Sequence, residues 1–392
     1  MNRAILSRWL LGADAMLQRA GAWRIALLVG IAALALRLAR LAVHPAVPDG
    51  DERTYMALAG SLARHGRFSV DALGPLEDHF GPLYPLLQAA IILLGASSLH
   101  AGLAVSLLAG SLAPPLVYLL ALRQWKQPAA AAAAGLAAVV HPGMIGASRM
   151  IYTEALTSAL LLLAVLSVFS RRRPGFLCGF ALGLAALTRR ESAFLVPFFM
   201  AALWANRTEP GPPPRWREPL RLLLIFLLVF APYLVYLRLA SGHWTMSAKA
   251  NYAWIVGRLM EERPDEEITV QRIHDLEKQY PTPLHWFLDR PLQTFKGLVQ
   301  SALLHLGLVF FGAGAWPIGI VALLGLARAL LHRSMKLWPP SPLLIPFVLV
   351  LFWALAGPTL RYSRALGPFV CGLVAGLPAR NGRADEGLKT SP

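Results

Sequence analysis

Three carboxylates lie close together in the segment that follows the first apolar run. Asp49, Asp51 and Glu52 open a predicted helix that continues to residue 63, and Asp51 shares one face of it with Tyr55, four residues on. Mutual repulsion among neighbouring carboxylates favours one that accepts a proton near neutral pH, which is what a general base must do. Asp51 also stands where a helix N-cap is expected, so a purely structural role is the alternative.

A pair of arginines, Arg189 and Arg190, interrupts an apolar part of the chain. About 33 residues separate the basic clusters at 171–173 and 207, and as helix they span roughly 50 Å, whereas two full crossings need about 60 Å. The turn 188–191 is therefore expected below the outer surface of the membrane. A guanidinium at that depth costs a few kcal/mol or more unless it faces a polar cavity or a partner. We interpret the pair as a lining for an anionic lipid headgroup; a charge cluster with Glu191, or snorkelling, is the alternative.

Further arginines are expected at the same outer level. Arg149 precedes one apolar run, and Arg361-Tyr362-Ser363-Arg364 precedes the last one. The planar guanidinium binds two phosphate oxygens at once, so these positions are candidate phosphate ligands.

The elements that position these residues are apolar helices. Of 392 residues, 56% are hydrophobic and only 15% are charged, and the mean hydropathy is +0.53. Soluble domains carry about 25% charged residues. Several apolar runs reach the roughly 18 residues that cross a bilayer, and backbone groups in lipid must form hydrogen bonds within their own segment. The sequence therefore predicts an all-α polytopic membrane protein.

The distribution of charge predicts topology rather than nucleic-acid binding. The net charge is +16, but the basic residues bunch between apolar runs, as the positive-inside rule describes. This pattern predicts cytoplasmic termini and about ten crossings, the first of which is a retained helix rather than a signal peptide. The segment 297–311 is interpreted as interfacial or as part of a long tilted helix. The crossings are expected at 25–43, 100–122, 129–145, 152–169, 175–187, 192–205, 220–239, 314–331, 343–355 and 365–377.

Two long outer loops, 44–98 and 241–296, collect the acidic residues. The second contains a predicted amphipathic helix around 268–280, and its aromatic residues are candidates for sugar stacking or for an interfacial belt. We therefore divide the chain into an N-terminal module, 1–240, which includes the catalytic first loop, then the outer loop 241–296 and the C-terminal helices 297–392.

The order of these motifs resembles a known enzyme family. Asp51-Glu52 with Tyr55, the Gly-Pro-Leu-Tyr-Pro motif at 81–85, and the motifs at 152–156, 186–193 and 361–362 follow one another as in GT-C-fold glycosyltransferases. The similarity is to the protein O-mannosyltransferase and lipid A aminoarabinose transferase type, that is, glycosyltransferase family 39 and its bacterial relatives. The similarity in motifs covers about residues 38–197, and the rest of the chain is similar mainly in its topology.

The resemblance implies an inverting transfer of a sugar from a polyprenyl monophosphate. Asp51 matches the family's catalytic acidic residue, and Glu154 matches a second acidic position that orders the site. Arg189 matches the arginine of a Leu-Thr-Arg-Pro-Glu pattern in which Arg190 replaces proline, and His79 stands where many relatives carry a lysine or arginine. The expected substrate-binding residues are Glu52, Tyr55, His79, Tyr84, Arg149, Arg189, Arg190, Arg361, Tyr362 and Arg364.

The expected partners are a polyprenyl-phosphate sugar donor, membrane lipid, and a glycan, lipid or protein acceptor, with no nucleic acid. We expect no required cofactor, because a phosphate monoester leaving group depends less on a metal ion than a diphosphate does. A divalent cation bound by the acidic cluster stays possible. The resemblance places the enzyme in the cytoplasmic (inner) membrane with its active site on the outer face. The alternatives are a transporter or flippase of a lipid-linked substrate, a non-catalytic scaffold, and an oligosaccharide-transferring enzyme of the same fold.

Overall fold

The described part of the chain is helical, with no strand. The computed structural model describes residues 12–331, 341–349 and 364–376, except 13, 72, 206–215, 243, 245–253, 257–258, 260–268 and 281. In chain order the helices are α2 (Ala22–Val43), α3 (Asp51–His65), α4 (Leu83–Leu93), α5 (Ser98–Trp125), α6 (Pro128–Val140), α7 (Pro142–Ala147), α8 (Glu154–Val168), α9 (Pro174–Thr188), η1 (Arg190–Leu195), α10 (Val196–Ala205), α11 (Arg217–Ser241), α13 (Val270–Gln279), α14 (Pro283–Asp289), α15 (Pro291–Phe311), η2 (Gly312–Gly314), α16 (Trp316–Leu331), η3 (Pro342–Val348), η4 (Arg364–Leu366) and α19 (Gly367–Val374).

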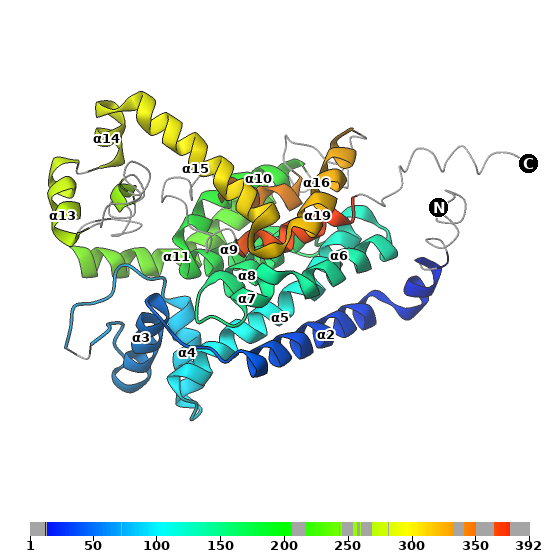
Figure 1. Cartoon of the computed structure of the whole chain (residues 1–392), viewed down its shortest axis with the longest axis horizontal. Helices are drawn as coiled ribbons and strands as arrows, with labels where there is room; N and C mark the ends of the chain where they lie inside the picture. The colour runs from blue at the N-terminus through cyan, green and yellow to red at the C-terminus, as the bar shows by residue number, and fades with distance from the viewer. Residues whose placement is uncertain are drawn as a thin grey trace, which may run out of the picture.

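Four helices in this part are long and apolar enough to cross a membrane. They are α2, α5, α11 and α15, and several shorter apolar helices accompany them. The chain is therefore an integral membrane protein, as its composition predicts. Both predicted loops contain helices, α3 and α4 in the first and α13 and α14 in the second, and Figure 1 shows α3 and α13 at the same end of the bundle.

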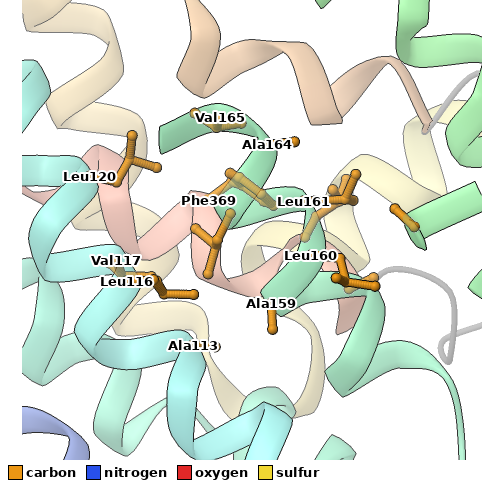
Figure 2. Close-up of a cluster of buried hydrophobic side chains, with 14 of the residues drawn as sticks. Ala113, Leu116, Val117, Leu120, Ala159, Leu160, Leu161, Ala164, Val165 and Phe369 are labelled. Atoms are coloured by element: carbon orange, nitrogen blue, oxygen red, sulfur yellow. The ribbon is translucent and has the colours of Figure 1, made fainter. Parts of the chain in front are cut away.

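Helix α5 forms the centre of the bundle. Its most apolar window is 67% buried, whereas the corresponding windows of α2, α11 and α15 are 28% buried, so those three leave most of their surface for lipid. Figure 2 shows the core at which α5 meets α8 and α19, where Leu116, Val117 and Leu120 lie close to Phe369. Small side chains between them, such as Ala113 and Ala159, allow the close approach that membrane helices need.

Helices α9 and α11 run parallel and pack closely. Three glycines on one face of α9 allow the close contact, because they meet the backbone and side chains of α11. A methyl group at Gly175 would lie 2.1 Å from the carbonyl oxygen of Glu218, and one at Gly179 would lie 2.4 Å from that of Leu222. One turn further on, a methyl group at Gly183 would lie 2.7 Å from Val229. Residues four apart share a helix face, so this stripe lets the two helices pack along their length.

The structure bears on the predicted topology at two places. Helix α9 has 15 residues and a length of about 22 Å, so it falls short of a full crossing, as the spacing of the basic clusters predicts. The segment 297–311, which was expected to be interfacial or part of a long tilted helix, belongs to the 21-residue helix α15. By length and composition α15 is a candidate crossing in addition to the ten that the sequence predicts. The predicted helix at 268–280 is confirmed as α13 in its described residues.

The glycine stripe leads to a stability prediction. Gly179→Ala gains about 1 kcal/mol of helix propensity but places a methyl group against the Leu222 carbonyl, so the helices must separate. We expect the thermal unfolding midpoint in detergent, followed by tryptophan fluorescence, to fall by several degrees. Gly307→Ala in α15 is the matched control, because a methyl group there has no atom within 4 Å, and it is expected to keep or raise the midpoint. Equal shifts in the two variants would contradict this account.

Candidate functional site

The connection between α7 and α8 has polar contacts with several distant parts of the chain. It is defined here, together with the first residue of α8, as residues 148–154 and is called the α7–α8 connection. Ser148 accepts a hydrogen bond from Arg37 of α2 (2.9 Å), and Arg149 donates one to the carbonyl oxygen of His44 (2.7 Å). Three further contacts come from α3, from η4 and from the turn after α9. The connection thus brings distant segments of the sequence to one end of α8.

The start of α3 is fixed to this connection by Glu52. One carboxylate oxygen of Glu52 accepts a hydrogen bond from the main-chain N–H of Ile151 (2.6 Å), and the other accepts one from that of Asp49 (3.1 Å). Glu52 reaches back to the residues before its own helix, much as in a capping box, and it is 6% exposed. Its carboxylate is therefore used within the fold. The neighbouring Asp51, the first residue of α3, is half-buried beside it.

Two glycines of α5 allow the connection to lie directly on that helix. A methyl group at Gly102 would lie 2.6 Å from the Ile151 side chain, and one at Gly110 would lie 2.0 Å from the hydroxyl oxygen of Ser148. Side chains at these two positions would push the connection away from α5. The two glycines of α5 therefore determine how closely the connection, with Glu154 and the attached Glu52, approaches that helix.

Glu154, Arg189 and Glu191 form a largely buried charge cluster. An Nη1–Oε1 contact of 3.2 Å joins Arg189 to Glu154, and an Nε–Oε1 contact of 2.6 Å joins it to Glu191. The side chain of Glu154 is 2% exposed and that of Arg189 is 10% exposed. The alternative expected from the sequence was a local cluster of Arg190 with Glu191. In the structure Glu191 pairs with Arg189 instead, and the cluster includes Glu154, 35 residues away in the sequence. Arg189 is well placed to hold Glu154, the second acidic position that the resemblance implies.

Arg190 binds the segment that precedes α4. Its guanidinium donates hydrogen bonds to the carbonyl oxygens of Asp78 (2.9 Å) and His79, and to the Tyr233 hydroxyl (3.4 Å), which in turn donates to the carbonyl of Phe80 (3.1 Å). The segment can approach so closely because a methyl group at Gly81 would lie 2.5 Å from two carbonyl oxygens at the end of α9. The donors of Arg190 therefore hold the first loop against α9 and α11.

The predicted tyrosines belong to a buried aromatic group. The ring of Tyr55 lies edge-on to those of Phe80 (5.0 Å between centroids) and Tyr84 (5.3 Å). Tyr84 is fully buried, and its hydroxyl bonds to the Gly102 carbonyl (3.1 Å) and the Ser106 hydroxyl (2.6 Å). These contacts align α3, α4 and α5 and place Tyr55 one turn below Asp51.

The remaining predicted residues lie around the same connection or outside the described part. Arg364 donates to the thioether sulfur of Met150 (2.9 Å), whereas Arg361 and Tyr362 lie outside the described residues. The half-exposed His79 contacts Asp78 (2.6 Å). Together with Glu77 they form the group that could hold a metal ion in the described part of the chain, although one Glu77 oxygen already accepts main-chain N–H bonds from residues 79 and 80.

Arg37 and His141 were not among the residues predicted from the sequence. Arg37 is fully buried, donates to Ser148 and to the carbonyl of Ala33 (3.1 Å), and has one terminal nitrogen with no partner among the described residues. His141, also buried, precedes α7, and its Nε2 has no hydrogen bond within the same part of the chain. A charged residue inside the first apolar run was the available signal, since an intramembrane arginine implies a polar partner.

Comparison with known proteins confirms the resemblance found in the motifs. Residues 78–236 match the family described as dolichyl-phosphate-mannose-protein mannosyltransferase. A comparison with curated protein sequences found no match.

Solved structures with the same arrangement of helices include the oligosaccharyltransferase AglB of Archaeoglobus fulgidus, in complex with an inhibitory peptide and a dolichol-phosphate. It is 14% identical, with a TM-score of 0.57 that covers 96% of this chain and 52% of that one. The same enzyme tethered to an acceptor peptide gives 16% identity and a TM-score of 0.55 over 93% of this chain and 50% of that one. ArnT of Cupriavidus metallidurans bound to undecaprenyl phosphate is 15% identical. Its TM-score is 0.43, and the match covers 94% of this chain and 78% of that one. The AglB likeness shows a shared GT-C fold, and the chain spans about half the length of AglB.

The buried charge cluster predicts a specific pattern of stability. Arg189→Met leaves the Glu154 carboxylate buried beside an apolar group, and breaking a buried pair in this way costs about 3–5 kcal/mol. Arg189→Met combined with Glu154→Gln removes both charges, so we expect it to recover a large part of the loss in thermal unfolding midpoint. Losses that simply add in the double variant would show that the two side chains do not depend on each other.

Proposed function

We propose that this protein is a membrane glycosyltransferase that moves a sugar from a polyprenyl-phosphate donor to an acceptor at the outer face of the membrane. The match of residues 78–236 to a mannosyltransferase family supports this class of reaction. The fold is shared with AglB, whose structure contains a dolichol-phosphate and a peptide, and this supports a polyprenyl-linked donor. The chain spans about half of AglB, so its activity, donor and acceptor are part of the proposal.

The observation that carries the proposal is the joint attachment of two acidic residues to the α7–α8 connection. The hydrogen bond from Ile151 to Glu52 brings the start of α3, and with it Asp51, to the residues just before Glu154. Arg189 holds Glu154 three residues further along. These two contacts support a site in which Asp51, the proposed catalytic carboxylate, and the buried Glu154 lie toward the same end of α8.

In the proposed mechanism Asp51 acts as the general base. Its carboxylate takes the proton of an acceptor hydroxyl or amine while that atom attacks the anomeric carbon of the sugar. The bond from the anomeric carbon to the phosphate oxygen breaks on the opposite face, so the configuration inverts and the polyprenyl phosphate leaves with the bonding electron pair. The neighbouring Glu52 does not compete for the proton transfer, because its two oxygens bind main-chain N–H groups.

Stabilising the leaving phosphate is the main electrostatic task of such a site. Arg189 is balanced by two carboxylates, and Arg190 and Arg149 donate to main-chain carbonyls, so we assign the phosphate contact chiefly to Arg364. Within the described residues, the side-chain partner of Arg364 is a thioether, which is a weak acceptor. Its positive charge is therefore available to an anionic ligand next to the α7–α8 connection.

A divalent cation is not required by this mechanism. A phosphate monoester leaves as a stable anion, and the arginines supply positive charge. The group Glu77, Asp78 and His79 has oxygen and nitrogen ligands suited to a cation, and it lies on the segment that Arg190 holds. A cation there would act by fixing that segment.

The first test is Asp51→Asn in the full-length protein. Loss of the general base should lower kcat for transfer from a polyprenyl-phosphate monosaccharide by about 100- to 10,000-fold, with unchanged expression and unfolding midpoint. Asp49→Asn is the control, because Asp49 is exposed and the substituted side chain keeps an oxygen that can accept from Gly50.

Near-normal turnover of Asp51→Asn would remove Asp51 from the mechanism. Activity only with a diphosphate-linked oligosaccharide would assign the chain to the oligosaccharide-transferring enzymes of the fold. Movement of the lipid-linked sugar across a vesicle membrane without transfer would instead support a flippase.

A second test concerns the phosphate. Arg364→Gln removes a charge-assisted contact worth about 1.5–3 kcal/mol, so KM for the donor should rise about 10- to 100-fold. The exposed Arg53→Gln serves as control, since its guanidinium bonds to the carbonyl of Pro48 at the same end of the molecule. Steady-state kinetics with varied donor concentration distinguishes the two variants, and an unchanged donor KM in Arg364→Gln would place the phosphate elsewhere.

A further inference from the structure

A charged hollow lies at the opposite end of α9 from the candidate active site, where α9 and α11 begin. It has a volume of about 400 Å³ and is lined by Arg173, Phe176, Arg217, Glu218 and Arg221. Sites for small ligands commonly have volumes of about 300–1,000 Å³. Because α9 spans about 22 Å between this hollow and Arg189, the hollow is separate from the candidate active site.

The wall of the hollow is fixed by Glu218. One carboxylate oxygen of Glu218 accepts a hydrogen bond from the N–H of Gly175 (2.9 Å), in the first turn of α9, and the other pairs with Arg221 (2.5 Å). The close contact of Gly175 with the Glu218 carbonyl, described above, holds the two helix starts together. Glu218 and Arg221 thus balance each other and build a rigid side of the site.

The other two arginines keep their charge for a ligand. Within the part of the chain that the structure describes, neither the Arg173 nor the Arg217 guanidinium has a hydrogen bond or an ion pair. Three guanidinium groups therefore face one carboxylate in the hollow, and the exposed Arg171 and Arg172 add positive charge nearby. Paired guanidinium groups of this kind suit the oxygens of a phosphate group.

The surroundings favour a lipid over a soluble anion. Phe176, which lines the hollow, is 40% exposed and stacks on Phe180, which is 46% exposed (6.5 Å between centroids, 6° between planes). On α11, Leu224 follows Arg217 and Arg221 on the same face and is 57% exposed. Apolar surface therefore leads from the charged hollow along two membrane helices, as acyl chains attached to a bound headgroup require.

We propose that this hollow binds the phosphate headgroup of an anionic phospholipid from the leaflet opposite the candidate active site. The phosphate lies between Arg173 and Arg217, and an acyl chain runs along Phe176 and Phe180. A positive-inside signal needs basic residues but no shaped cavity. Topology alone therefore explains the arginines but not the hollow that they line.

The test uses the full-length protein in neutral detergent, with phosphatidylglycerol as the probe and native mass spectrometry as the readout of bound lipid. Arg173→Gln combined with Arg217→Gln should weaken retention by about 30-fold, which corresponds to about 1 kcal/mol for each arginine. The matched control is Arg171→Gln combined with Arg172→Gln, which removes the same charge next to the hollow and should keep most of the binding. Phosphatidylcholine should bind weakly to all three proteins.

Each opposite outcome overturns the proposal. Equal losses in the two double variants would reduce the effect to general surface charge. Equal binding of phosphatidylcholine would remove the role of headgroup charge, and displacement of the lipid by millimolar inorganic phosphate would show a site for a soluble anion. Since Arg173 and Arg217 make no described contacts that support the fold, unfolding midpoints without lipid should be unchanged. If the double variant does not fold, Arg217→Gln alone, with an expected loss of about fivefold, replaces it.

Discussion

The hydrogen bond between the buried carboxylate of Glu52 and the main-chain N–H of Ile151 connects the first loop to the helical bundle. A carboxylate that is removed from water must find donors, and the irregular backbone between α7 and α8 offers one because its N–H groups are not all used within a helix. The same segment takes Arg37 and Arg364 as further partners, and its own Arg149 donates to the carbonyl oxygen of His44. Polar groups therefore concentrate where the helices break, and any chemistry of this chain depends on that concentration.

The parallel pair α9 and α11 relates the two ends of the molecule. Its glycine stripe holds the helices in contact from Gly175 to Gly183, and beyond the stripe Arg190 meets Tyr233. Helix α9 is shorter than a full crossing, and the two arginines that follow it have partners within the protein, namely Glu154, Glu191 and carbonyls of the first loop. At the opposite end the arginines of the hollow face a space between the two helix starts.

For the two arginines at the end of α9, the sequence predicted the need for partners but not which groups would serve. The spacing of basic clusters predicts a short span here, and α9, with 15 residues, is shorter than a full crossing. The nature of those partners depends on residues 35 and more than 100 positions away, Glu154 and the carbonyls at 78 and 79. A submerged guanidinium is as well satisfied by a carboxylate or a carbonyl as by a ligand phosphate, so composition could not choose among them.

The sequence by itself determined the helical membrane architecture, the shortness of the segment before the turn after α9, and the motif order that resembles GT-C glycosyltransferases. These features depend on local quantities: the length and hydropathy of each run, the position of charges between runs, and a few short motifs. Only the tertiary structure decided that Glu52 binds Ile151, that Arg190 holds the first loop, and that α15 forms a further long apolar helix. It alone also brought Arg173 of α9 and Arg217 of α11 around one hollow. The physical reason is that a buried polar group accepts any partner of suitable charge, and the close approach that glycines permit between distant segments selects which partner it meets.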